Sequence, residues 1–185
     1  MRLFVGVPVP EDVKVDIGLI QEKIILSQTD LKIVERENLH FTLKFLGDVP
    51  EENVASISSV LDDIRLKHRC FSVSLQGVGV FPAEKFVRVV WVGVEENKLF
   101  LSLAADIQKA LEYIRREDYT ETHPHLTVAR VRSPHQVQVL VDVVHALKEV
   151  SFGEFTVDRF VLFQSALSRE GVVYTPIRVF QLQAQ

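Results

Sequence analysis

Two short segments, His40–Leu43 (HFTL) and His125–Val128 (HLTV), constrain the fold of this chain more than any other feature. In each segment a histidine and a threonine are two positions apart, and apolar residues occupy the other two positions. Residues i and i+2 of an extended strand point to the same face of a sheet. Each segment is therefore predicted to be a strand that buries its apolar side chains and presents an imidazole and a hydroxyl on the opposite face.

Chance does not account well for this repetition. The chain has six histidines in 185 residues, and a random order would give roughly 0.2 His-x-Thr triplets. Each segment is also followed by a proline that can open a helix, Pro50 in one case and Pro134 in the other. A helix precedes each motif, and a pair of strands follows. We therefore predict two similar α+β units, offset by 85 residues, whose motif strands face each other across a shared cleft.

Apolar periodicity predicts the other elements. The expected fold class is α+β: one domain over residues 1–185, with two antiparallel sheets lining a central cleft and the helices outside. The spacing predicts helices from Pro10 to about Gln28, from Pro50 through Ile64, from Leu99 to Ile114 and from Pro134 through Leu147. The predicted strands are Leu3–Val9, Lys32–Val34, His40–Phe45, Phe71–Val80, Phe86–Val94, His125–Val131, Phe155–Leu162 and Val172–Phe180.

Composition limits the partners and the compartment. The formal net charge is −4, so an anionic partner such as RNA must be bound by a local basic patch and not by a global field. No stretch of 18 apolar residues is present, so we expect no membrane association. The single cysteine, Cys70, cannot form an internal disulfide, which fits a reducing compartment. We expect a cytoplasmic protein.

Two opposed imidazoles suit general acid–base chemistry. The ordinary pKa of histidine is near 6.5, so both protonation states are accessible at neutral pH. In-line displacement at phosphorus needs a base on one side and an acid on the other. The hydroxyls of Thr42 and Thr127 are suited to binding the non-bridging phosphoryl oxygens, and the Arg130 guanidinium is suited to neutralising their charge. The motifs therefore indicate phosphoryl-transfer chemistry.

Two other interpretations of the histidines are open. A catalytic zinc site usually has a third protein ligand, and neither motif segment contains a carboxylate, so the sequence disfavours a metal site. Two core histidines could also share this pattern by chance, which the repetition disfavours. His123 lies two positions before His125, but Pro124 indicates a strand start, so a structural role is favoured over a substrate contact.

The residues around the motifs resemble those of a known family. Residues 40–47 (HFTLKFLG) and 123–130 (HPHLTVAR) are similar to the two signatures of the 2H phosphoesterases, and Val34–Leu39, Gly79–Pro82 and Arg88–Val94 extend the resemblance. Within that family the chain resembles the RNA 2′,3′-cyclic phosphodiesterases, formerly called 2′-5′ RNA ligases. The resemblance implies a bilobal, pseudo-twofold fold and hydrolysis of a 2′,3′-cyclic phosphate to a 2′-phosphomonoester, without metal or cofactor. Val128 departs from the commoner leucine.

The resemblance also implies roles for the motif residues. His40 would donate a proton to the departing 3′ oxygen, and His125 would accept a proton from water. Thr42 and Thr127 would hold the phosphate. The expected substrates are RNA ends or cyclic nucleotides, and we expect a monomer. The alternatives are 2′-5′ ligation by the reverse reaction and a non-catalytic RNA-binding module. Candidates for the local basic patch are Lys44, Lys85, Arg88 and Arg132. Phe81 and Tyr174 could stack on a base, although core packing is favoured for Phe81.

Overall fold

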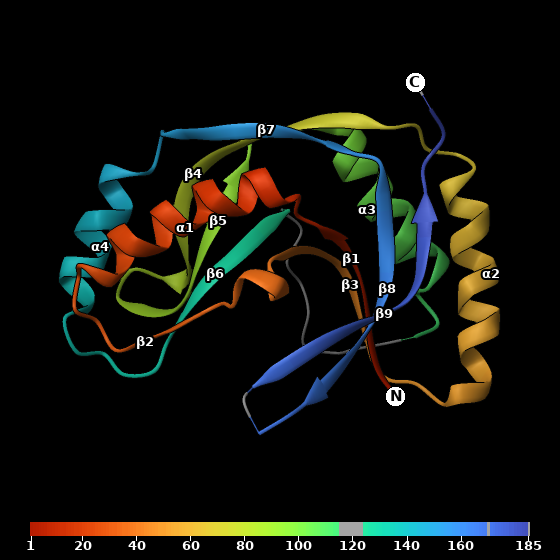
Figure 1. Cartoon of the computed structure of the whole chain (residues 1–185), viewed down its shortest axis with the longest axis horizontal. Coiled ribbons are helices and arrows are strands. Elements are labelled where there is room, and N and C mark those ends of the chain that lie inside the picture. Colours follow the sequence, from red (N-terminus) through yellow and green to blue (C-terminus); the bar gives the residue numbers. More distant parts are fainter. Residues whose placement is uncertain (115–123, 170, 185) are drawn as a thin grey trace.

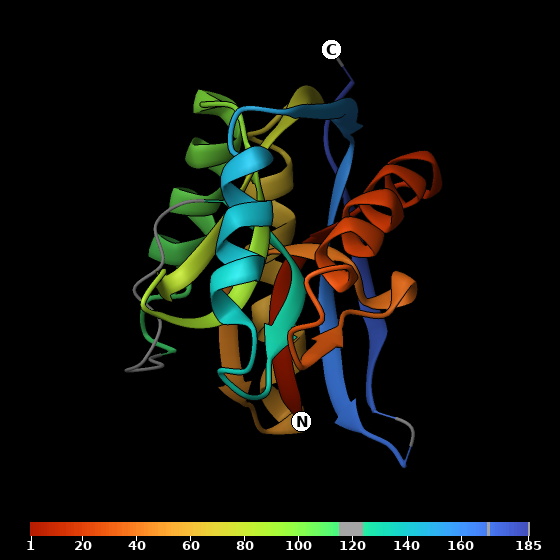
Figure 2. The same cartoon turned by 90° about the vertical axis from the view of Figure 1, so that its left-hand side faces the viewer.

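The computed structural model describes residues 1–114, 124–169 and 171–184 (Figures 1 and 2). The predicted α+β class is confirmed, with four α-helices and nine strands in these ranges. The helices are α1 (Glu11–Ile25), α2 (Val54–Arg65), α3 (Lys98–Ala110) and α4 (Val137–Ala146). The strands are β1 (Arg2–Pro8), β2 (Leu31–Ile33), β3 (His40–Asp48), β4 (Phe71–Ala83), β5 (Phe86–Val94), β6 (His125–Val131), β7 (Ser151–Val157), β8 (Arg159–Leu167) and β9 (Val172–Gln181). Short 3₁₀ turns, η1 (Arg36–Asn38) and η2 (Glu51–Asn53), precede β3 and α2.

The strands form one hydrogen-bonded path in the order β7-β4-β5-β6-β3-β1-β8-β9, and β2 pairs with β6. The sequence predicted two sheets, whereas the path is continuous. At the centre of this path the pairing is short, because β3 and β6 are joined by one register pair, Phe41 with Leu126. In Figure 1, β1, β3, β8 and β9 lie with α2 and α3 on the right, and β2, β4, β5 and β6 lie with α1 and α4 on the left.

Both motif strands carry a bulge at the same place. On β3, Thr42 pairs with Gly6 and Lys44 pairs with Val5, so Leu43 is the extra residue. On β6, Thr127 pairs with Trp91 and Ala129 pairs with Val90, so Val128 is the extra residue. Each of these β3 residues and its partner lies 85 positions before its β6 counterpart. The 85-residue offset between the two motifs therefore also holds for the way each motif strand pairs with its neighbouring strand.

The order of the strands along the chain differs from their order in space. Strands β4 and β5 come between the two motifs in sequence and lie on the β6 side of the sheet, whereas the C-terminal β8 and β9 lie on the β3 side. The helices exchange sides in the same way: α1 contacts β6, and α3 contacts β3. Each motif strand is therefore supported by a helix from the other part of the chain.

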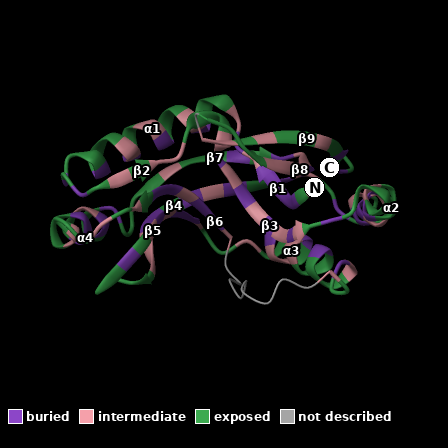
Figure 3. Ribbon diagram, turned by 90° about the horizontal axis from the view of Figure 1, so that it is seen from below, coloured by how far each residue is buried: buried purple, intermediate pink, exposed green. Residues whose placement is uncertain are grey.

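Apolar side chains between helices and sheet form a continuous core. The buried stripe of α1 is Val13, Ile17, Ile20 and Ile24, which are spaced as a helix requires. Helix α3 begins where the Asn97 side chain accepts hydrogen bonds from the backbone N–H groups of Leu99 and Phe100, both at 3.1 Å. The outer faces of the helices are exposed (Figure 3), and β1 is buried along most of its length. No described helix has the length and apolar character to cross a membrane.

One predicted strand, Phe155–Leu162, is wrong. The chain forms two strands there, β7 and β8, which break at Asp158. Val157 pairs with Phe71 of β4, whereas Arg159 pairs with Gln181 of β9. The backbone carbonyl of Asp158 accepts a hydrogen bond from Leu182 at 2.7 Å. Asp158 and Arg159 interrupt the apolar residues at the break, but two adjacent polar residues do not by themselves show that the strands on either side pair with different partners.

Several helix ends also differ from the prediction. Helix α1 ends at Ile25, before the predicted Gln28, and α2 begins at Val54, because the residues after Pro50 form the 3₁₀ turn η2. Helix α4 begins at Val137, after Gln136 in the left-handed region at φ +57°, and Pro134 lies in the preceding turn. Helix α3 ends at Ala110, where Leu111 leaves helical geometry although the apolar spacing continues to Ile114. Elsewhere β5 and β6 match their predicted limits.

Candidate active site

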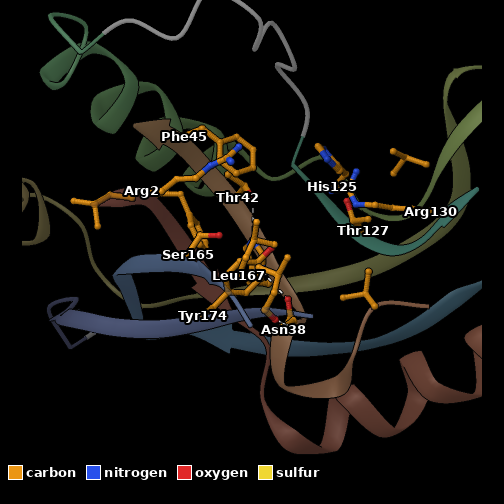
Figure 4. Close-up of a pocket in the computed structure, with 16 residues that line it drawn as sticks. Arg2, Asn38, Thr42, Phe45, His125, Thr127, Arg130, Ser165, Leu167 and Tyr174 are labelled. Atoms are coloured by element: carbon orange, nitrogen blue, oxygen red, sulfur yellow. Dashed lines mark hydrogen bonds between the residues drawn. The ribbon is translucent and has the colours of Figure 1, made fainter. Parts of the chain in front are cut away.

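A cavity of about 560 Å³ lies where β3 and β6 meet. Figure 4 shows Thr42 and Phe45 on one side of it and His125, Thr127 and Arg130 on the other. Strand β1, the β2–η1 segment, Val89 of β5 and the β8–β9 hairpin supply the remaining walls. The complete lining is Arg2, Leu3, Phe4, Val34, Asn38, His40, Thr42, Phe45, Val89, His125, Thr127, Arg130, Ser165, Leu167, Val172 and Tyr174. All five predicted site residues therefore line one cavity.

The register explains how the four motif side chains come together. Phe41 and Leu126 are directly opposed and fully buried, so their neighbours on both strands face the cavity. Extending this antiparallel register by one residue places His40 opposite Thr127, and Thr42 opposite His125. This extension sets each histidine across from the threonine of the other motif, while Phe41 and Leu126 remain the register pair that joins the strands.

The two bulges add a third cavity residue to each strand. In a regular strand, residues 45 and 130 would point to the face opposite Thr42 and Thr127. The extra residues at Leu43 and Val128 reset the alternation, so that Phe45 and Arg130 line the cavity. The predicted role of Arg130 near phosphate depends on this bulge.

His40 is held by two hydrogen bonds. Its Nδ1 lies 2.7 Å from the backbone carbonyl oxygen of Asn38, and its Nε2 lies 3.0 Å from the Thr42 hydroxyl oxygen. A carbonyl can only accept, so Nδ1 carries the proton and donates. In the neutral ring, Nε2 accepts from Thr42. The Asn38 side chain donates in turn to the backbone carbonyl of Val172 at 2.9 Å, which ties this segment to β9.

The surroundings of His40 disfavour its charged form. Its ring centroid lies 4.7 Å from that of Phe4 and 5.0 Å from that of Tyr174. Burial is the main cause that lowers the pKa of His40 from 6.5 to about 4, and the positive charges of Arg130 and His125 act in the same direction. The hydrogen bond to the Asn38 carbonyl opposes this effect. The ring is therefore neutral near pH 7 before any ligand binds.

His125 lies in a different aromatic setting. Its exposed fraction is 9%, and Phe81 and Trp91 approach its ring edge-on at centroid distances of 5.1 and 6.4 Å. Phe81 and Trp91 also stack on each other at 5.1 Å. Phe81, for which the sequence favoured core packing over base stacking, thus packs against these two rings.

The cations near the cavity differ from the predicted set. Lys44, Lys85, Arg88 and Arg132 do not line it; Arg88, for example, lies over the Phe86 ring at 4.7 Å. Arg2 lines the cavity instead (Figure 4). No pattern in the sequence points to Arg2 beyond its place at the start of a predicted strand.

Some predicted features remain separate from the cavity or untested. His123 lies outside the described residues. Within the described ranges, no group of three or more His, Cys, Asp or Glu side chains is arranged to hold a metal ion. Tyr174, the other predicted stacking candidate, does line the cavity, and burial raises the pKa of its hydroxyl.

Comparisons with known proteins agree with this geometry. Residues 9–169 match the model of the 2′-5′ RNA ligase superfamily. A protein from Methanothermobacter thermautotrophicus, named RNA 2′,3′-cyclic phosphodiesterase, is 36% identical over 98% of this chain and 99% of its own length. A crystal structure of a Thermus thermophilus protein has a TM-score of 0.84 at 30% identity and covers all of both chains. Escherichia coli LigT complexed with phosphate has a TM-score of 0.75 at 25% identity, over 98% of this chain and 97% of that chain.

Proposed function

Because the chain belongs to the 2′-5′ RNA ligase superfamily, we propose that it hydrolyses 2′,3′-cyclic phosphates at RNA ends to 2′-phosphomonoesters. One observation carries this proposal: a single cavity collects both His-x-Thr pairs on opposed strands. The relatives from Methanothermobacter thermautotrophicus and Archaeoglobus fulgidus, each 36% identical, are named RNA 2′,3′-cyclic phosphodiesterase, which supports the same activity.

The reaction divides between the two histidines. His125 accepts a proton from water, whose oxygen forms the new bond to phosphorus. The bond between phosphorus and the 3′ oxygen breaks on the opposite side, and His40 donates the proton that this oxygen takes up. The products are a 2′-phosphomonoester and a free 3′ hydroxyl.

The lowered pKa of His40 favours its neutral form near pH 7, so its role as donor depends on the substrate. The negative charge of a bound cyclic phosphate raises the pKa of His40 and stabilises the imidazolium. The proton then resides on Nε2, because Nδ1 already donates to Asn38. Substrate binding thus prepares the acid that the reaction needs.

Thr42, Thr127 and Arg130 hold the phosphate. The hydroxyls hydrogen-bond its non-bridging oxygens, and the guanidinium of Arg130 stabilises the charge that these oxygens carry in the transition state. The LigT structure that contains phosphate supports a phosphate site in this fold.

We further propose that residues 1–185 form one bilobal domain with pseudo-twofold symmetry and a sheet in each lobe. The matching bulges at Leu43 and Val128 and the single pair between β3 and β6 support two similar lobes that meet at the motif strands. A monomer is proposed because both histidines of the site come from one chain. The single cysteine supports a cytoplasmic location.

A direct test uses an RNA oligonucleotide that ends in a 2′,3′-cyclic phosphate. The wild-type protein should convert this end to a 2′-phosphomonoester in the presence of EDTA, and His40→Ala and His125→Ala should each lower kcat by at least ~10²-fold. His135→Ala, which changes an exposed histidine in the turn before α4, is the matched control. A 3′-phosphomonoester product would overturn the assigned roles, ligation would favour the reverse reaction, and binding without turnover would favour the RNA-binding module.

A further inference from the structure

A second cavity adjoins the first. It also measures about 560 Å³ and lies between the β2–η1 segment and the tip of the β8–β9 hairpin. It shares five lining residues with the first cavity: Val34, Asn38, Arg130, Val172 and Tyr174. The two cavities therefore form one continuous groove that leads away from the motif residues.

Two cations lie on neighbouring strands beside these cavities: Arg130 lines both of them, and Lys32 lines the second. Lys32 of β2 and Arg130 of β6 are directly opposed in an antiparallel register, so their side chains lie on the same face. Like charges in directly opposed positions destabilise a sheet. Among the described residues, no carboxylate lies within ion-pair distance of either side chain, although Glu35 and Glu37 line the same cavity. This arrangement suits an anion bound between the two cations.

The wall of the second cavity that is formed by the hairpin, at Gly171, lies close to the side chain of Lys32. A side-chain carbon built at Gly171 would lie 3.9 Å from the Lys32 Nζ, and Gly171 has φ +143°. Strand β8 pairs with β1 as far as Gln164, whereas its pairing with β9 continues to Leu167 and Val172, so the hairpin tip extends past β1. The hairpin tip and β2 thus form the two sides of the second cavity, which continues from the first.

We propose that the second cavity binds the nucleotide that precedes the cyclic-phosphate end of RNA, with Lys32 and Arg130 holding the phosphodiester between the two nucleotides. This inference rests on the proposed function of the first cavity. Each cavity then holds one nucleotide. Arg130 lines both cavities and Lys32 lines the second, so the phosphodiester that links the nucleotides would lie between the two cations. Glu35 and Glu37 offer acceptors to ribose hydroxyls or base amino groups. The substrate class is RNA of two or more nucleotides.

The test compares a cyclic mononucleotide with a dinucleotide that ends in the same cyclic nucleotide. Wild-type kcat/KM should be at least ~10-fold higher for the dinucleotide, and it should fall more steeply with added salt, because one more phosphate is contacted. Lys32→Gln should reduce the ratio of the two kcat/KM values toward one, and Lys32→Arg should retain it. Lys67→Gln, at an exposed position beyond α2, is the matched control.

Binding gives a second readout that does not require turnover. Wild-type protein should bind the 2′-phosphorylated dinucleotide with a Kd at least ~10-fold lower than that of the 2′-phosphorylated mononucleotide. Lys32→Gln should remove this difference. If neither cyclic substrate is hydrolysed but the Kd values behave in this way, the proposed function fails and the subsite stands. Equal kcat/KM and equal Kd for both lengths, or an equal loss for both lengths in Lys32→Gln, would overturn the subsite.

Discussion

His40 and His125 have the same side chain in opposite settings. His40 packs against Phe4 and Tyr174 and donates to a backbone carbonyl, whereas His125 lies beside Phe81 and Trp91. Burial among the neighbouring rings lowers the pKa of His40 to about 4, so its neutral form is favoured near pH 7. At the scale of single residues, His40 offers the measurable consequences.

The first consequence concerns stability. The pKa of His40 is about 4 in the folded protein and 6.5 in the unfolded chain, so the unfolded chain binds more protons between these pH values. The free energy of unfolding should therefore fall as the pH falls from 6.5 to 4, by up to about 3 kcal/mol from this residue. Urea denaturation of the wild type and of His40→Ala across this range measures the effect. His40→Ala should lose less stability than the wild type, and equal slopes would contradict the prediction.

The second consequence concerns the pH dependence of catalysis. The proton donor must be charged, and a bound phosphate raises the pKa of His40. The profile of kcat/KM reports the free enzyme, and that of kcat reports the complex. The loss of kcat at high pH should therefore occur at a higher pH than the loss of kcat/KM. Initial rates from pH 4 to 10 on one cyclic-phosphate substrate check this, and coincident limbs would argue against His40 as the donor.

At the scale of elements, the hairpin of β4 and β5 supports His125 through aromatic packing. Gly79 of β4 pairs with Trp91 of β5, and a side-chain carbon at Gly79 would lie 2.2 Å from the Trp91 ring. That distance is far below van der Waals contact, and an indole is rigid, so the ring would have to move. The glycine thus sets the position of the rings beside His125.

Gly79→Ala should therefore lower kcat by roughly tenfold or more while His125 remains present. Trp91 is the only tryptophan of the chain, so a change in fluorescence emission should accompany the loss. Gly18→Ala is the control: it lies within α1, no other atom lies within 4 Å of the added carbon, and the helix should gain about 0.5–1 kcal/mol. Unchanged emission and activity in Gly79→Ala would contradict the role of this packing.

At the scale of the whole molecule, the site depends on how two groups of strands meet. Phe41 lies at the single pair between β3 and β6, is fully buried, and contacts Phe100 and Phe155 at centroid distances of 5.5 and 6.2 Å. These rings come from α3 and β7. A change at this junction shifts one motif strand relative to the other and touches neither histidine.

Phe41→Leu should cost about 1–2 kcal/mol of stability and lower kcat more than a matched core change elsewhere. Phe160→Leu is the control, because Phe160 is equally buried and stacks on Phe180 within the β8–β9 pair. Both variants should show similar midpoints in urea denaturation, with the larger loss of kcat in Phe41→Leu. Equal activity in the two variants would show that the junction does not set the geometry.

The sequence by itself determined the motif strands, the α+β class and the repeat offset, and it predicted the acid–base pair, since side-chain alternation and residue chemistry are local properties. Tertiary structure decided the rest of the site. The bulge at Val128 directs the Arg130 side chain into the cavity, and the register of β2 places Lys32 opposite Arg130. Arg2 and Tyr174, which lie near opposite ends of the sequence, both line the cavity. Neither bulges nor strand partners leave a periodic signal, because they are set by packing between segments distant in sequence.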